Sequence, residues 1–158
     1  MTYSLPPWKK QNPVRNRRNP PNPKRKKNKA TPENPQRQRR MSKGKVLLAE
    51  DDITMVSLLK TLLKMEGYEV VALQPDEDIL SAVRVEQPDV LLMDVYLSTQ
   101  SGLEVLEQLR NSADTSDLRV VMSSGASVKE ECLRRGADGF LAKPYMPDDL
   151  ITMLRQTI

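Results

Sequence analysis

Four of the strand-like segments of this 158-residue chain are followed directly by polar residues. The apolar run 90–93 follows a proline and stops at Asp94, which predicts a buried strand with a carboxylate at its end. A charge in a core needs a partner, because burying an unpaired charge is too costly. The segments and their polar ends are 45–49 with Glu50, Asp51 and Asp52; 90–93 with Asp94; 118–122 with Ser123 and Ser124; and 139–142 with Lys143. Acids or hydroxyls at three ends and a lysine at the fourth indicate a single polar site.

The chemistry that these residue types favour is phosphoryl transfer. Glu50, Asp51 and Asp94 would repel one another unless a cation neutralised them, and an all-oxygen ligand set favours Mg²⁺, with Mn²⁺ or Ca²⁺ as alternatives. A carboxylate beside such an ion can attack phosphorus to give an aspartyl-phosphate. Lys143 could then pair with one phosphoryl oxygen, and the hydroxyl of Ser124 could donate to another.

The elements that must position these residues alternate along the chain. Apolar runs predict strands at 45–49, 68–73, 89–93, 118–122 and 139–142, and helical spacing predicts helices at 53–66, 75–86, 102–110, 128–135 and 146–156. This alternation predicts an α/β fold, a doubly wound five-stranded parallel sheet covered by helices on both faces. In such sheets ligands bind beyond the carboxyl ends of the strands, which is where the polar residues fall.

Charge divides the chain into two parts. Residues 1–45 carry 15 Lys/Arg and one acid, Glu33, for a net charge of +14, whereas residues 46–158 carry 10 Lys/Arg and 20 acids, for a net charge of −10. Eight of the 12 prolines also lie before residue 46. We therefore expect a disordered basic arm over residues 1–43 and a folded domain over residues 44–158. Because Met41 directly precedes the first expected strand, the arm could be a native extension, the result of a start site assigned too far upstream, or an added segment.

Several classes of protein are disfavoured by composition. No segment resembles a membrane-spanning helix or a signal peptide, and the single cysteine, Cys132, allows no internal disulfide, so we expect a cytoplasmic protein. The chain has no histidine, which removes His-based metal sites and histidine general bases. Cys132 is expected in the core.

Four motifs in order resemble the receiver domain of bacterial two-component response regulators, over about residues 45–158. They are Leu47-Leu48-Ala49-Glu50-Asp51-Asp52; Leu91-Leu92-Met93-Asp94 with Gly102 eight residues on; Val120-Val121-Met122-Ser123-Ser124-Gly125; and Gly136-Ala137-Asp138-Gly139-Phe140-Leu141-Ala142-Lys143-Pro144. The resemblance implies a flavodoxin-like fold with strand order 2-1-3-4-5. It also implies that a histidine kinase or histidine phosphotransfer protein phosphorylates Asp94.

The same resemblance assigns the remaining roles. Glu50 and Asp51 would hold Mg²⁺ together with Asp94, and Tyr96 would lend the ion its backbone carbonyl. Ser124 and Phe140 would form the switch pair. Spacing selects Asp51 over Asp52, which we expect to be a bystander or a helix cap, and selects Ser124 over Ser123.

The chain departs from the family pattern in three places. Ser98 stands where the family commonly has proline, which implies a less rigid loop. The switch aromatic is Phe140 rather than tyrosine, and the interval of 19 residues from Ser124 to Lys143 is slightly short. Since no chemical group is lost, we expect a phosphorylatable domain.

Simpler interpretations exist for each residue taken alone. Acids before a helix are usually caps, Lys143 alone would be a solvated surface charge, and Phe140 alone could be plain core. Only the combination favours the site.

We expect a stand-alone phosphoacceptor rather than an enzyme, one that changes the affinity of an unknown downstream protein through its last two strands and helices. An alternative is a protein that binds an anionic polymer such as RNA or DNA through the basic arm, with the domain as its regulator. The arm could also bind an anionic membrane or fold back on the acidic domain. A phosphatase is disfavoured because Tyr96 stands where related folds have a second aspartate.

Overall fold

The structure is a computed structural model that describes residues 42–158, and the predicted arm lies almost wholly outside the described residues. Strands and helices alternate from Lys45 onward. The strands are β1 (Lys45–Ala49), β2 (Glu69–Ala72), β3 (Val90–Asp94), β4 (Arg119–Ser124) and β5 (Gly139–Ala142). The helices are α2 (Ile53–Met65), α3 (Ile79–Glu86), α4 (Gly102–Asn111), α5 (Lys129–Arg134) and α6 (Pro147–Thr157).

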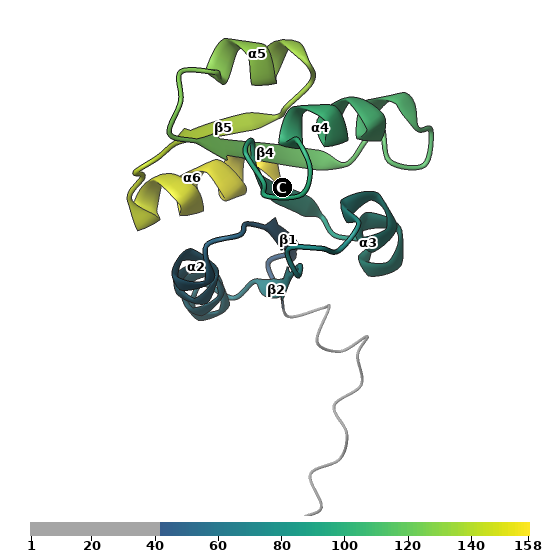
Figure 1. The fold of residues 1–158 in the computed structure, drawn as a ribbon. Coiled ribbons are helices and arrows are strands. Elements are labelled where there is room, and N and C mark those ends of the chain that lie inside the picture. Colours follow the sequence, from purple (N-terminus) through teal and green to yellow (C-terminus); the bar gives the residue numbers. More distant parts are fainter. Residues whose placement is uncertain (1–41) are drawn as a thin grey trace, which may run out of the picture. The chain divides into compact units, whose positions relative to one another are not determined.

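All five strands pair in parallel, in the order β2-β1-β3-β4-β5 (Figure 1). This confirms the predicted doubly wound, flavodoxin-like sheet. The order changes direction between β1 and β3, so the carboxyl ends of these two neighbours flank the switch point where ligands bind in such sheets.

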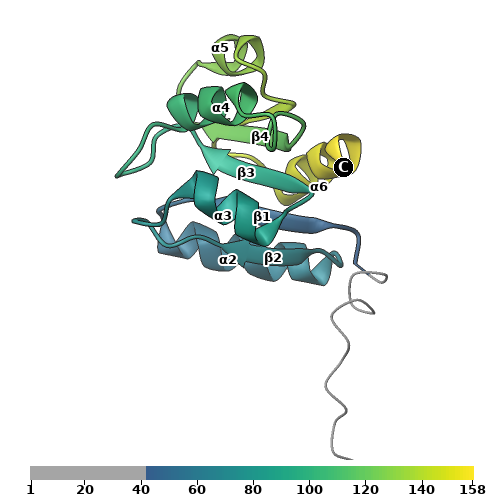
Figure 2. The same cartoon turned by 90° about the vertical axis from the view of Figure 1, so that its right-hand side faces the viewer.

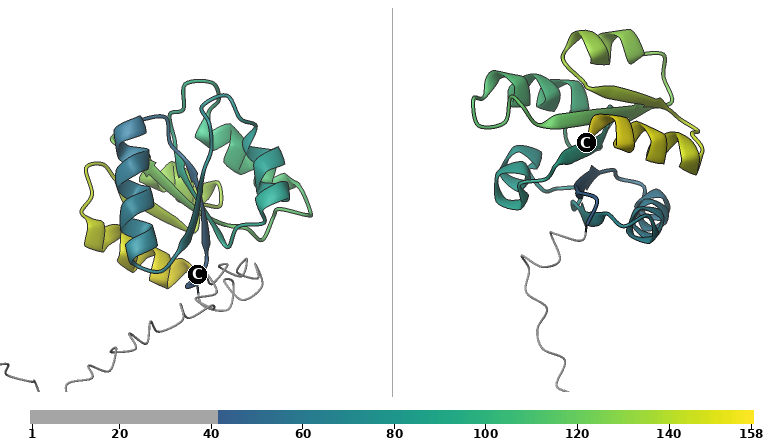
Figure 3. Two further views of the ribbon diagram at one scale, coloured as in Figure 1. Left: turned by 90° about the horizontal axis from the view of Figure 1, so that it is seen from below. Right: turned by 180° about the vertical axis from the view of Figure 1, so that it is seen from behind.

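The sheet is covered on both faces, as its continuous apolar strands require (Figure 2). One core cluster joins alternate strand residues to α3, α4 and α5, and the other joins the intervening residues to α2 and α6. Figure 3 shows α2 and α6 on one side of the strands and α3 and α4 on the other. Cys132 is fully buried in the first cluster, as predicted.

Capping explains where two helices begin. The side chain of Asp52 accepts hydrogen bonds from the amides of Thr54 and Met55, at 2.9 and 3.0 Å, which confirms the predicted cap of α2. The helix predicted from residue 75 begins only at Ile79, because Asp78 caps it through the amide of Ser81, at 2.9 Å. Residues 74–77 form a turn instead.

Two strands run further than predicted. Asp94 is the last residue of β3, and both serines after the apolar run belong to β4. No helix among residues 42–158 is long and apolar enough to cross a membrane.

Candidate active site

Three of the predicted strand ends meet around one ammonium group. The Lys143 Nζ donates to Glu50 Oε2 at 2.6 Å and to Asp94 Oδ2 at 2.8 Å, although these partners lie 93 and 49 residues away in sequence. Glu50 follows β1, Asp94 ends β3 and Lys143 follows β5, so the sheet order brings them together. The structure thus unites a predicted phosphoacceptor, a predicted metal ligand and the predicted lysine.

The cluster is largely shielded from water. The side chains of Glu50, Asp94 and Lys143 are 8%, 15% and 22% exposed. Burial disfavours the charged amine, but the hydrogen bonds from Lys143 to Asp94 and Glu50, and the negative charges of both, outweigh burial and raise the pKa of Lys143. The lysine therefore stays a cation at neutral pH beside two carboxylates.

Asp51, the other predicted metal ligand, has a different partner. Its Oδ2 accepts a hydrogen bond from the backbone amide of Ser98, in the loop after β3. In the same loop the amide of Tyr96 donates to Asp94 Oδ1 at 3.1 Å, and the Tyr96 side chain is exposed. The loop therefore touches both predicted ligand carboxylates through backbone groups.

Gly102 lets this loop turn into α4 close to the end of β3. A Cβ added at Gly102 would lie 2.3 Å from the backbone oxygen of Asp94 and 3.0 Å from the backbone of Val95, far inside normal contact distance. The amide of Gly102 donates to the carbonyl of Val95 at 2.9 Å. A side chain here would displace the residue that carries the predicted phosphoacceptor.

The predicted switch residues lie in β4 and β5. Ser124 is 1% exposed, lies opposite Ala142, and its Oγ accepts from the amide of Ala126 at 3.1 Å. Ser123 lies opposite Asp94 and is also buried. The backbone amide of Lys143 donates to the carbonyl of Ser124 at 2.9 Å. Within residues 42–158 neither serine hydroxyl makes a hydrogen bond to the side chain of Asp94 or Lys143, so the choice of Ser124 stays a prediction. Phe140 is largely buried in the core cluster beneath α3, α4 and α5.

The donor set fits Mg²⁺, although its carboxylates do not form a closed cage. Across the described residues no three His, Cys, Asp or Glu side chains converge in a metal-binding arrangement. Mg²⁺ typically needs only one or two protein carboxylates, with waters and phosphate oxygens completing its octahedron. Glu50, Asp51 and Asp94 offer only oxygen ligands, and they lie at adjacent strand ends. Glu50 and Asp94 already share the positive charge of Lys143, which Mg²⁺ could partly replace.

Tyr145 is a neighbour of this cluster that sequence reasoning missed. Burial is the main cause that raises the pKa of its phenol, and the carboxylates of Glu50 and Asp94 raise it further. The positive charge of Lys143 lowers this pKa, but by less. No spacing rule singles it out, because its proximity depends on the path of the chain after β5. The amide of Ser98 was missed for a similar reason: only the folded loop shows its partner.

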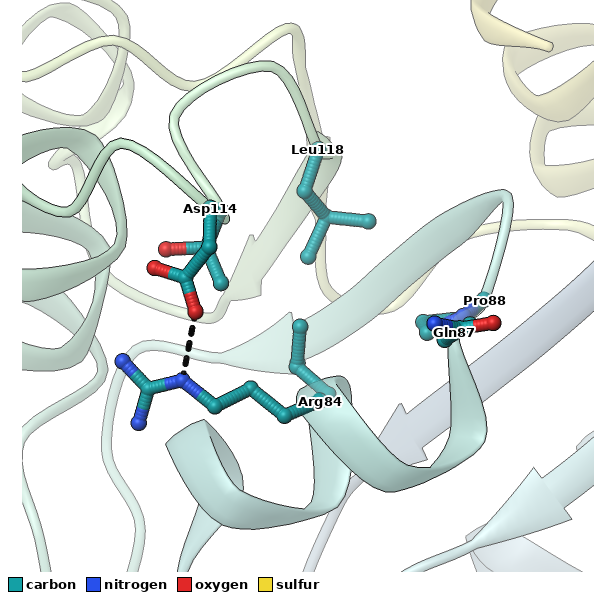
Figure 4. Close-up of a pocket in the computed structure, with 7 residues that line it drawn as sticks. Arg84, Gln87, Pro88, Asp114 and Leu118 are labelled. Carbon is teal, nitrogen blue, oxygen red and sulfur yellow. Dashed lines mark hydrogen bonds and ion pairs between the residues drawn. The ribbon is translucent and has the colours of Figure 1, made fainter.

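A surface hollow of about 510 Å³ lies away from this cluster, between the end of α3 and the connection from α4 to β4 (Figure 4). Arg84 donates to Asp114 across it at 2.7 Å, with Gln87, Pro88 and Leu118 alongside. These residues precede β3 and β4, so the hollow lies at the amino edge of the sheet and contains no predicted site residue.

The sequence profile of the response regulator receiver domain matches residues 46–155, well over half of the chain. The chain belongs to the response regulator receiver domain family. This receiver domain is 32% identical over 111 residues to the transcriptional regulatory protein CpxR of Escherichia coli (strain K12), which covers 70% of this chain and 47% of CpxR. The chain spans about half the length of the curated relatives it matches.

Solved structures agree with the assignment. A putative response regulator from Chloroflexus aurantiacus J-10-fl is 29% identical with a TM-score of 0.67, over 72% of this chain and 96% of that chain. The receiver domain of the sensor histidine kinase PA1611 from Pseudomonas aeruginosa PAO1, which has a magnesium ion in its active site cleft, shares the fold at 24% identity and a TM-score of 0.61. That alignment covers 72% of this chain and 96% of the other.

Proposed function

We propose that this receiver domain accepts a phosphoryl group on Asp94 from the phosphohistidine of a partner kinase or phosphotransfer protein in the cytoplasm. The observation that carries the proposal is the pairing of Lys143 with both Asp94 and Glu50 at the carboxyl edge of the sheet. A carboxylate oxygen of Asp94 attacks phosphorus, the bond from phosphorus to the imidazole nitrogen breaks, and the histidine leaves with its electron pair.

The neighbouring residues have separate tasks in this transfer. Lys143, which holds Asp94 Oδ2 before the reaction, pairs with a phosphoryl oxygen once the acyl phosphate has formed. Bound Mg²⁺, held by Glu50, Asp51, Asp94 and the carbonyl of Tyr96, would supply neutralising charge for the transferring group. Hydrolysis of the acyl phosphate resets the domain.

The output step would pass through Ser124 and Phe140. The hydroxyl of Ser124 accepts from the amide of Ala126 and still has its own hydrogen, which it would donate to a phosphoryl oxygen by moving toward Asp94. Such a movement at the end of β4 would shift the population of states of the face formed by β4, β5, α5 and α6, and so the affinity for a downstream protein.

The test is labelling by a small phosphodonor with and without Mg²⁺. We expect hydroxylamine-labile label in the wild type only with Mg²⁺, none in Asp94→Asn, and wild-type label in Asp117→Asn, which changes an exposed acid far from the site. Label that persists in Asp94→Asn would overturn the assignment.

A second candidate function rests on the charge asymmetry of the chain. Residues 1–45 carry a net charge of +14, whereas residues 46–158, with a net charge of −10, would repel a polyanion. Any binding of RNA or DNA would therefore depend on the arm and weaken steeply with salt.

The deciding comparison is the full chain against residues 41–158 in a titration with single-stranded RNA and duplex DNA at several salt concentrations. We expect binding by the full chain only, with a log-log salt slope of roughly −0.7 to −0.9 for each phosphate neutralised. Equal binding by both proteins, or none by either, would reject this candidate.

A further inference from the structure

The contact between Ser98 and Asp51 depends on the residue type at position 98. The backbone amide of Ser98 donates to Asp51 Oδ2, and a proline at this position would have no N–H to donate. Lys143 is the side chain that donates to carboxylates of the site, whereas Asp51 accepts from a backbone amide, so this contact is fixed by the path of the loop. A hydrogen bond from an amide to an ionised carboxylate is also among the stronger kinds in proteins.

The next two residues attach the same loop to a different part of the fold. Thr99 Oγ1 donates to the carbonyl of Pro75 at 2.8 Å, and Gln100 Nε2 donates to the carbonyl of Glu77 at 3.2 Å. Residues 98–100, which we call the strap, thus join Asp51 at the end of β1 to the turn between β2 and α3.

This turn is itself closed by two hydrogen bonds. The amide of Gln74 donates to Glu77 Oε2 at 3.1 Å, and the amide of Glu77 donates back to the carbonyl of Gln74 at 3.0 Å. Residues 74–77 therefore form one hydrogen-bonded turn. Their side chains are exposed, so any movement is presented at the surface.

Little free space lies beneath the strap. The space lined by Asp51, Pro75, Leu97 and Gln100 is about 10 Å³, which is no more than a single water requires. Because the parts are joined by hydrogen bonds with little space between them, we expect a shift of the Asp51 carboxylate to move its neighbours.

We propose that Ser98 is a positioning residue for Asp51, and that the strap carries the state of the metal site to the surface of residues 74–77. The proposal rests on the proposed function in so far as Asp51 holds Mg²⁺. A carboxylate offers about four acceptor positions, so one amide hydrogen bond leaves room for a metal bond. With Mg²⁺ bound, Asp51 would be fixed in place, and the strap would hold the turn more tightly.

The first experiment compares Ser98→Pro with Ser98→Ala by amide hydrogen exchange in the metal-free protein. Ser98→Ala keeps the N–H and loses only the exposed hydroxyl, so we expect wild-type exchange. Ser98→Pro removes the donor, and we expect exchange about tenfold faster in peptides covering residues 74–78 and 96–101, the scale for losing one charge-assisted hydrogen bond. Equal exchange in the two variants would overturn the positioning role.

A second variant controls for a general effect of proline on the conformation of the loop. Thr99→Val removes the hydroxyl that reaches Pro75 but leaves the Ser98 amide in place. We expect faster amide exchange in residues 74–78 and unchanged exchange in the strands of the sheet. An unaltered turn in this variant would show that the strap does not hold it.

The second experiment adds Mg²⁺ and follows the same peptides, with affinity measured separately by calorimetry. In the wild type and Ser98→Ala we expect slower exchange in both peptides, and in Ser98→Pro protection of 96–101 without protection of 74–78. If Mg²⁺ binds Asp51→Asn as tightly as the wild type, the proposed metal role fails while the metal-free comparison still tests the strap. If Mg²⁺ binds through Asp51 but leaves residues 74–78 unchanged in the wild type, the strap proposal is wrong.

Discussion

Replacing Lys143 with methionine should destabilise the domain more than any other single loss of charge. At an effective dielectric constant near 20, a unit charge pair at 2.6–2.8 Å is worth about 6 kcal/mol, and Lys143 makes two such contacts. Desolvation of the three groups offsets most of this. Removing one partner of a buried pair costs about 3–5 kcal/mol, so we expect a loss of about 2–4 kcal/mol for this partly buried cluster.

The assay is equilibrium unfolding in urea at pH 7, with Lys64→Met on the exposed face of α2 as the matched control. In Lys143→Met the facing carboxylates of Glu50 and Asp94 lose the cation that they share and repel each other. Mg²⁺ should also stabilise this variant more than the wild type, since the ion can replace the lost cation. A free energy of unfolding equal to that of the control would refute the reasoning.

In the wild type, the raised pKa of Lys143 sets the pH above which the contacts of its ammonium group no longer stabilise the folded state. A group whose pKa is raised on folding stabilises fully below its unfolded value, here the ordinary lysine value of 10.5, and the contribution is lost as pH rises through the folded pKa. The difference between the wild type and Lys143→Met should therefore be constant from pH 7 to about pH 10 and fall above it.

Three further substitutions test the scaffold of the site. Gly102→Ala should cost about 1–3 kcal/mol in urea unfolding and lower phosphodonor labelling, whereas Gly125→Ala, with no atom within 4 Å of its new Cβ, should do neither. Asp78→Ala should cost about 1 kcal/mol because it removes the cap of α3. Hydrogen bonds from the hydroxyl and the amide of Ser81 lower the pKa of Asp78 in the folded state. The difference from the wild type should therefore disappear as pH falls through that pKa. Arg110→Lys should cost about 1–3 kcal/mol because lysine cannot reproduce the four hydrogen bonds of the guanidinium. Arg84→Lys, at an exposed ion pair, should leave the free energy of unfolding close to that of the wild type. Equal losses within either matched pair would contradict the contacts assigned to them.

The sequence predicted the sheet and much of the site because both depend on strongly patterned features. Apolar runs located the strands, and the rule that parallel strands end at one edge placed Glu50, Asp94 and Lys143 together before any distance was known. Family resemblance supplied the strand order and the roles. The structure confirms the order and the meeting of these three residues.

What could not be predicted depends on loop paths and on single hydrogen bonds. Helix α3 begins at Ile79 rather than at residue 75, because capping by Asp78 outweighs the favourable start at a proline. The partnership of Ser98 with Asp51 spans 47 residues and involves a backbone group, so no side-chain pattern records it. The choice between Ser123 and Ser124 rests on spacing, and their burial is nearly equal.

The most direct measurement of the central claim is chemical trapping of the phosphorylated residue. After reaction with a small phosphodonor and Mg²⁺, borohydride reduces an aspartyl-phosphate to homoserine, which peptide sequencing by mass spectrometry can locate. We expect homoserine at position 94 alone. Homoserine at position 51 or 52, or labelled protein with none at position 94, would contradict it.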